Sequence, residues 1–252
     1  MALIMEYMTW PELAKVIDQV KVALVPVGSC EQHGPNSTFY TDSGRADAMT
    51  KLLAERMGNK VLAFPPVTYG MSQHHMDFPG TVTLTPDTLA KVYEEIGASI
   101  AKHGIRKIVF IVGHGGNMCS CECAAINLKM KHGIEAYWTG FGSRTATGGL
   151  IPPCPAYGHA DEFEVSSTLG LCPQYVSPRE KLQPGEMQSS LYTVEGFHNG
   201  AFSWKYDVSM NGALGDARLS SQEIGDNMRE EALTKLQKLI ERIIEHELPD
   251  CK

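Results

Sequence analysis

Short, continuous apolar runs alternate with amphipathic segments over the N-terminal two thirds of the chain. Continuous rather than alternating apolarity is typical of strands that are covered on both faces. Amphipathic segments between such strands are typical of the crossover helices of a parallel sheet, so the pattern predicts an α/β fold. Four buried strands are predicted, at Val22–Val27, Lys60–Phe64, Lys107–Val112 and Ile134–Thr139.

Helix signals lie between and after these runs. Asp42 or Ser43 can cap a helix that runs to about Met57, because short polar side chains accept hydrogen bonds from the free N–H groups of a first turn. Thr85 is a second cap, and the helix that follows it should end near His103. Two further helices are predicted, at Asp161–Leu169 and Ser220–Glu245.

Composition excludes several classes of protein. The 252 residues are 43% hydrophobic, which is ample for a folded core. Because 22 Lys and Arg stand against 29 Asp and Glu, the net charge is −7, and without a basic run a nucleic-acid partner is not expected. The longest apolar runs fall far short of the roughly 20 residues that span a membrane. With no linker and no internal repeat, we expect one domain over residues 1–252.

The cysteines indicate a compartment. Seven cysteines are an odd number, and their spacing does not match a small disulfide scaffold. The N-terminus carries no basic region followed by an apolar stretch, as a secretory signal would. We therefore expect reduced thiols in a cytoplasmic protein.

Polar side chains with metal-binding chemistry follow the first strand. If the chain stays extended beyond Gly28, Glu31 and His33 point to the same side, where a carboxylate and an imidazole can share a divalent metal ion. Asp42 at the start of the next helix could bridge two ions. The alternative is an ordinary polar loop in which Asp42 is only a helix cap.

Two more clusters carry similar chemistry. The third strand ends in Gly113 and His114, and ligands bind at the carboxyl ends of parallel strands. The glycine-rich segment lacks the lysine of a phosphate-binding loop. Further along, His159 precedes Glu162 and Glu164, a spacing that is also common at a solvated helix start. Together the three clusters supply enough nitrogen and oxygen ligands for two ions.

Four motifs follow one another along the chain. They are Glu31-Gln32-His33-Gly34-Pro35 with Asp42, Phe78-Pro79-Gly80-Thr81, Gly113-His114-Gly115-Gly116-Asn117, and His159-Ala160 followed by Glu162 and Glu164. In this order and spacing, the motifs resemble those of the creatininase (creatinine amidohydrolase) family over roughly residues 8–170. The resemblance implies a three-layer α/β sandwich with a central, mainly parallel sheet, and a homo-oligomer, with a hexamer favoured.

The resemblance also implies two divalent metal ions per subunit, with zinc expected and manganese or iron as alternatives. Glu31 and His114 would bind one ion. His33 would bind the other, with Asp42 bridging both and Glu162 completing the second site. Whether Glu162 is only a ligand or also a base stays open.

Residues beside the metals would handle the substrate. His159 would move protons, and the expected substrate-binding residues are His75, Gly115 and Tyr157. After His114 the chain has two glycines where the creatinine enzyme has tyrosine and then a glutamate ligand. Tyr157 stands where that enzyme has a tryptophan. These departures indicate a family member other than creatininase itself.

The leading hypothesis is a hydrolase in which metal-activated hydroxide cleaves a small cyclic amide or related C–N substrate. A rival on the same site opens the ring of a polyhydroxylated cyclic diketone, derived from an inositol, by cleaving a C–C bond. A third is a non-catalytic metal-binding protein. The fourth is a thiol-redox protein that would use Cys119, Cys121 and Cys123. Small buried thiols that pack between helices explain these three cysteines better.

Overall fold

The molecule is built on a five-stranded sheet whose neighbouring strands are all parallel. A computed structural model describes residues 2–141, 158–190 and 202–247. In these residues the strand order is β1-β3-β2-β4-β5. The strands are β1 (Leu3–Ile4), β2 (Val22–Val27), β3 (Val61–Ala63), β4 (Lys107–Val112) and β5 (Glu135–Gly140).

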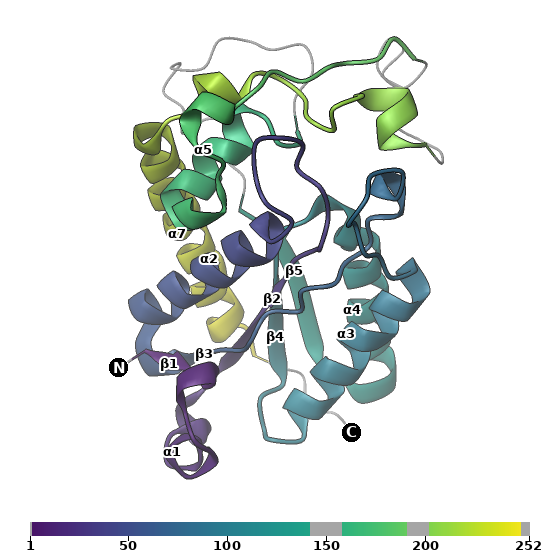
Figure 1. The fold of residues 1–252 in the computed structure, drawn as a ribbon. Coiled ribbons are helices and arrows are strands. Elements are labelled where there is room, and N and C mark those ends of the chain that lie inside the picture. The colour runs from purple at the N-terminus through teal and green to yellow at the C-terminus, as the bar shows by residue number, and fades with distance from the viewer. Residues whose placement is uncertain (1, 142–157, 191–201, 248–252) are drawn as a thin grey trace.

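Helices cover both faces of the sheet, which confirms the three-layer α/β fold (Figure 1). Side chains alternate along each strand, so Leu24 and Ile111 pack against α2 and α7, whereas Val25 and Phe110 pack against α3 and α4. Each of these four side chains is almost completely buried. The helices are α1 (Trp10–Ala14), α2 (Thr41–Met57), α3 (Pro86–Ala101), α4 (Met118–His132), α5 (Glu162–Leu171) and α7 (Gln222–Glu245).

The predicted elements are present, with small differences at their ends. Thr85 caps α3 through a hydrogen bond from the Thr88 amide, but the helix ends at Ala101, two residues before the predicted end. Ser221 caps α7 in the same way. The two-residue strand β1 was not predicted, because so short a segment shows no periodicity.

The connections create a crevice between two central strands. β2 leads through α2 to β3 on one side, whereas its neighbour β4 leads through α4, on the opposite face of the sheet, to β5 on the other side. Adjacent strands whose connections diverge in this way leave a crevice at their carboxyl ends, where α/β proteins bind ligands. Gly28 and Gly113 follow these two ends, and both lie against the first turn of α2.

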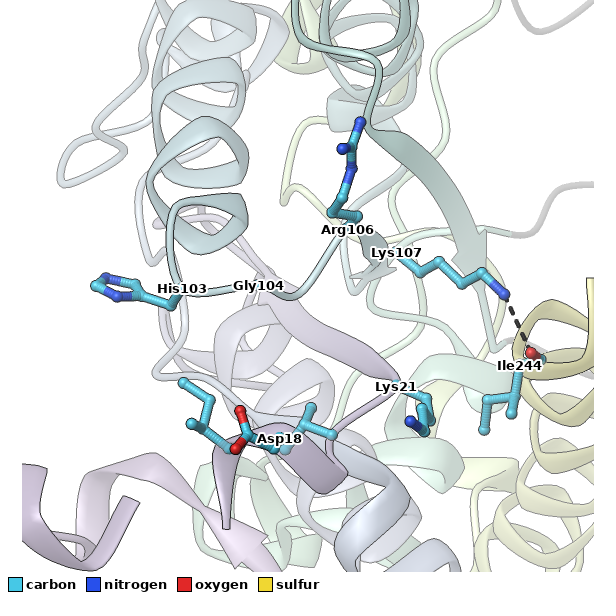
Figure 2. A pocket seen from close by; sticks show the side chains of 9 residues that line it. Asp18, Lys21, His103, Gly104, Arg106, Lys107 and Ile244 are labelled. Atoms are coloured by element: carbon cyan, nitrogen blue, oxygen red, sulfur yellow. Dashed lines mark hydrogen bonds between the residues drawn. The ribbon is translucent and has the colours of Figure 1, made fainter. Parts of the chain in front are cut away.

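The opposite end of the sheet holds a second hollow of about 320 Å³ (Figure 2). Here the Lys107 ammonium donates hydrogen bonds to the carbonyl oxygens of Ile243 at 2.7 Å and Ile244 at 3.0 Å. It therefore satisfies the last turn of α7, whose carbonyls have no partner within the helix.

Among the helices in the described residues, none combines the length and the apolar composition that a membrane span requires.

Candidate metal centre

Acidic and histidine side chains from distant segments meet at the carboxyl ends of β2 and β4. Each comes from a loop or a first helical turn beside the crevice, and nearly all are buried. These segments are the loop after β2, the starts of α2 and α5, the loop after β4 and the turn before α5. They contribute Glu31, His33, Asp42, His114, His159 and Glu164.

The shortest distances join histidine nitrogens to carboxylate oxygens. His114 Nδ1 lies 3.2 Å from Glu31 Oε1 and 3.3 Å from Asp42 Oδ2. On the other side of Asp42, His33 Nε2 lies 3.3 Å from Asp42 Oδ1 and 3.6 Å from Glu164 Oε2. Asp42 therefore lies between a Glu31–His114 pair and a His33–Glu164 pair, with one carboxylate oxygen facing each.

Backbone carbonyls orient the histidine rings. The other nitrogen of His33, Nδ1, donates to the carbonyl oxygen of Glu31 at 3.2 Å. His114 Nε2 donates to the carbonyl of Met71 at 2.9 Å, in the same manner. A hydrogen bond at one ring nitrogen fixes the tautomer and leaves the lone pair of the other nitrogen facing the carboxylates, as in many metal-binding histidines.

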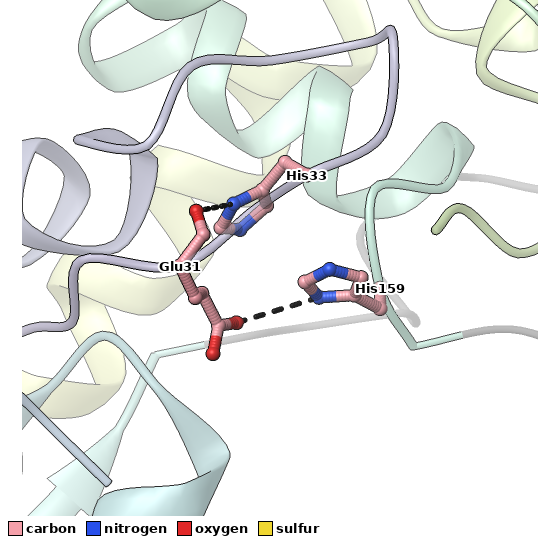
Figure 3. Close-up of side chains that lie close together, drawn as sticks. All are labelled: Glu31, His33 and His159. Carbon is pink, nitrogen blue, oxygen red and sulfur yellow. Dashed lines mark hydrogen bonds and ion pairs between the residues drawn. The ribbon is translucent and has the colours of Figure 1, made fainter. Parts of the chain in front are cut away.

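His159 approaches the centre from the turn before α5. Its Nε2 donates to the Gln32 carbonyl at 2.8 Å, while Nδ1 lies 3.5 Å from Glu31 Oε1 and 3.8 Å from Glu164 Oε2. Figure 3 shows the rings of His159 and His33 next to each other on one side of Glu31, and their centroids lie 4.5 Å apart. The backbone at the next residue, Ala160, has a φ of +50°, an uncommon conformation for a residue with a side chain.

The carboxylates set the electrostatics of the centre. Burial opposes protonation of His33, but Asp42 and Glu164 outweigh that effect and raise its pKa to about 9. The pKa of His114 is likewise raised well above its usual value by Glu31 and Asp42 against the effect of burial. Burial and the neighbouring His33 instead lower the pKa of His159, which favours its neutral form. The centre therefore attracts positive charge.

The donor set fits divalent metal ions. Although fully buried, His33 Nε2 and Asp42 Oδ2 have no hydrogen-bond partner in the described part of the chain. Leaving such atoms unpaired is costly unless an ion or water occupies the space between them. Imidazole nitrogens with carboxylate oxygens suit zinc and manganese. Three groups of side chains have ligand atoms within 4.8 Å of one another, namely His33-Asp42-Glu164, Glu31-His33-His159 and Glu31-His74-His114.

One predicted ligand lies elsewhere. Glu162 is fully buried, but its Oε2 accepts a hydrogen bond from the Asp216 amide at 2.7 Å, behind the centre. Glu164 occupies the place that the sequence analysis assigned to Glu162. Residues two apart on a helix differ by about 200° in direction, so only one of the two can face His33. Glu164, and not Glu162, therefore lies beside His33, and a role of Glu162 as ligand or base stays a prediction.

A cavity of about 270 Å³ opens beside the centre. His75 and Gly115 line it, as the sequence analysis expected of substrate-binding residues, whereas Tyr157 lies outside the described residues. His75 Nδ1 is 2.8 Å from Gln32 Nε2, and its ring packs 4.6 Å from the ring of Trp204. Aromatic side chains, Phe202 and Trp204, therefore form part of the cavity lining.

Several supporting residues escaped the sequence analysis. The Ser72 hydroxyl donates to Glu31 Oε2 at 2.6 Å, and Arg45 forms an ion pair with Glu164. Arg45 follows Asp42 by three residues on α2, a spacing that puts both on one helix face and could have been recognised. Ser72 lies 41 residues from Glu31 in an irregular loop, and no local pattern points to it.

Comparisons with known proteins show which family the chain resembles. A family model described as "Creatininase: Creatinine amidohydrolase" matches residues 6–240. A mycofactocin precursor peptide peptidase of Mycolicibacterium smegmatis is 33% identical, over 83% of this chain and 80% of the relative. A 3-dehydro-scyllo-inosose hydrolase of Thermotoga maritima is 26% identical, over 94% of this chain and 82% of the relative.

Solved structures share the fold. A structure named "Creatininase Mn" has a TM-score of 0.78 at 24% identity, and the match covers 96% of this chain and 98% of the other. A creatininase variant of "Zn-Zn type" has a TM-score of 0.79 at 24% identity, with the same coverage. Manganese and zinc are therefore named in structural neighbours of this chain.

Proposed function

The chain belongs to the creatininase (creatinine amidohydrolase) family of metal-dependent hydrolases, and from that premise we propose that it binds two divalent ions and hydrolyses an amide C–N bond. Glu31 and His114 would hold one ion, and His33 and Glu164 the other. Asp42 would bridge the two. Zinc and manganese are the proposed metals.

The position of Asp42 carries the proposal. Its two carboxylate oxygens each lie 3.3 Å from a different histidine, His33 on one side and His114 on the other. A carboxylate that served only as a helix cap would point to backbone amides, as Asp161 does at the start of α5. The Asp42 side chain forms no such cap on α2. Two ligand pairs on either side of a shared carboxylate suit a pair of ions.

When bound, two divalent ions at such a site lower the pKa of a water and polarise a substrate carbonyl. The protein supplies proton transfer through His159. Its Nδ1 faces the space between Glu31 and Glu164, while Gln32 holds Nε2. A neutral imidazole there can accept a proton from the attacking water and give it to the departing nitrogen, which would otherwise leave as an unstable anion.

The substrate that fits best is a small amide or the end of a peptide. A cavity of about 270 Å³ lies near the lower limit for ligand pockets, so it admits only a small group beside the reacting bond. The relative that is 33% identical is named a peptide peptidase, which favours a peptide amide over a cyclic one.

A second candidate is ring opening of a polyhydroxylated cyclic diketone by C–C bond cleavage. The support is the inosose hydrolase relative, whose match covers 94% of this chain. Attack on a ketone needs the same activation of a carbonyl oxygen, so the same ligands would serve.

A substrate panel separates these candidates. Protein loaded with zinc or manganese, and the same protein treated with a chelator, would be assayed against short peptides, cyclic amides including creatinine, and an oxidised inositol. We expect release of an amine from a peptide or cyclic amide by the loaded protein only. Activity confined to the oxidised inositol would favour the second candidate, and equal activity after complete metal removal would contradict both.

A further inference from the structure

The Glu31–His114 side of the centre is bordered by glycines and by a short helical turn. Beyond His114 the chain contributes two glycines, and an added Cβ at Gly116 would lie 2.3 Å from the His114 ring and from the Met71 carbonyl. No side chain at position 116 can therefore approach the ion from there. The next segment that borders this side is the short helical turn Gln73–His75.

Two hydrogen bonds link the residues just before this turn to the proposed metal ligands. The Met71 carbonyl accepts from His114 Nε2 at 2.9 Å, and the Ser72 hydroxyl donates to Glu31 Oε2 at 2.6 Å. The residues just before His74 are thus held in register with both Glu31 and His114. The position of His74 relative to the centre follows from these contacts.

The His74 ring is held in place by packing. It stacks on the His114 ring at 5.9 Å with an interplanar angle of 12°, and it contacts Phe202 at 5.5 Å and Trp204 at 5.8 Å. A ring nitrogen of His74 lies within 4.8 Å of ligand atoms of Glu31 and His114.

The ring nitrogens of His74 differ from those of the other histidines in the centre. His33, His114 and His159 each use one nitrogen in a hydrogen bond to a backbone carbonyl. In the part of the chain that the structure describes, neither nitrogen of His74 takes part in a hydrogen bond or an ion pair. A lone pair on His74 therefore has no competing partner in these residues.

We propose that His74 is an additional ligand of the ion held by Glu31 and His114. This inference rests on the metal centre proposed above. It gives this ion a second imidazole, whereas the His33–Glu164 side has one. Because zinc favours histidine nitrogen, the two sides should also differ in affinity and in the metal they prefer.

The test uses two variants of His74 and one control. His74→Phe keeps an aromatic ring against Phe202 and Trp204 but removes the nitrogens, and His74→Ala removes both the ring and the nitrogens. His103→Ala removes an exposed histidine beside the hollow at the opposite end of the sheet. The readouts are metal content after dialysis, zinc affinity by chelator competition, and the visible spectrum of the protein loaded with cobalt.

We expect wild type and His103→Ala to bind two ions. Both His74 variants should bind one ion about 10-fold to 100-fold more weakly, with the other unchanged and with an altered cobalt spectrum. A His74→Phe protein that binds two ions with wild-type affinity and spectrum would overturn the role of His74 as a ligand. Wild-type protein that binds no ion would instead contradict the proposed function.

Discussion

Glu162 and Glu164 are identical side chains two residues apart, yet they meet different surroundings. Glu164 lies beside His33 and forms an ion pair with Arg45, while Glu162 accepts a hydrogen bond from the Asp216 amide. The motif contains both, and its sequence does not reveal the helix phase. That phase is set by the turn at Ala160 and by Asp161, which caps α5 at the Glu164 amide. The Asp216 amide, distant in the chain, then donates a hydrogen bond to Glu162, the glutamate that does not face His33.

The two glutamates make a matched pair of variants. Glu164→Gln should weaken binding of one ion by at least about tenfold, because an amide lacks the charge that faces His33. Glu162→Gln should keep both ions. Metal content and chelator competition measure the difference, and a Glu162→Gln protein that alone loses an ion would restore the original assignment of Glu162.

His159 should affect turnover without affecting metal content. We expect His159→Ala to lower kcat by about 10²-fold to 10⁴-fold, the usual contribution of a positioned acid or base, while both ions remain bound. Steady-state kinetics with a substrate identified by the panel, together with metal analysis, provide the check. Near wild-type kcat in His159→Ala would exclude His159 as the group that transfers protons.

Strands and helix caps that depend on a short segment of sequence could be predicted. The strands β2 and β4 are continuous apolar runs, and Thr85 caps α3 as predicted. Neither Asp42 nor Ser43 caps α2, because that helix begins after Tyr40 without a side-chain cap. The strand ends also placed four of the five predicted ligands together, since neighbouring parallel strands end at one edge of the sheet. Contacts between segments far apart in the chain, such as Ser72 with Glu31, leave no local signal.

The three cysteines of helix α4 differ in their exposure to solvent. Cys121 is fully buried, and burial raises its thiol pKa to about 12, whereas Cys119 and Cys123 are exposed. A raised pKa leaves little of the reactive thiolate at pH 8, so Cys121 should alkylate far more slowly than the other two. Mass spectrometry after timed alkylation measures the rates. Loss of activity in Cys119→Ser or Cys123→Ser would revive a thiol-based function.

Lys107 connects β4 to the end of α7. Lys107→Met should lower the free energy of unfolding by about 1–3 kcal/mol, because the carbonyls of Ile243 and Ile244 lose their donor. Lys21→Met, at an exposed lysine that lines the same hollow, is the control and should leave stability nearly unchanged. Urea denaturation measures both. Equal stability of the two variants would show that Lys107 does not stabilise the helix end.

At the scale of the whole molecule, the core packs on both faces of one sheet and the centre draws residues from β2 to α5. We propose that residues 1–252 unfold as one domain. A homo-oligomer, with a hexamer favoured, stays a prediction that light scattering can test. No local sequence pattern predicts the cooperativity of unfolding or the oligomeric state, because both depend on surfaces that meet only after folding.

Metal binding should couple to the stability of this domain. Ligands that bind only the folded state raise its stability, so removing the ions should lower the Tm and adding zinc should restore it. Without the ions, the fold holds carboxylates and histidines from several segments close together, and some of their buried atoms have no hydrogen-bond partner in the described residues. Scanning calorimetry of loaded and chelated protein provides the comparison. An unchanged Tm would contradict binding at a site that the fold assembles.

The proposed function places two ions on either side of Asp42. A crystal structure of the metal-loaded protein, with anomalous scattering recorded at the metal absorption edge, tests it directly. We predict two peaks roughly 3.5–4 Å apart, one beside Glu31 and His114 and the other beside His33 and Glu164. A single peak, or peaks that Asp42 does not contact, would contradict a bridging role for Asp42.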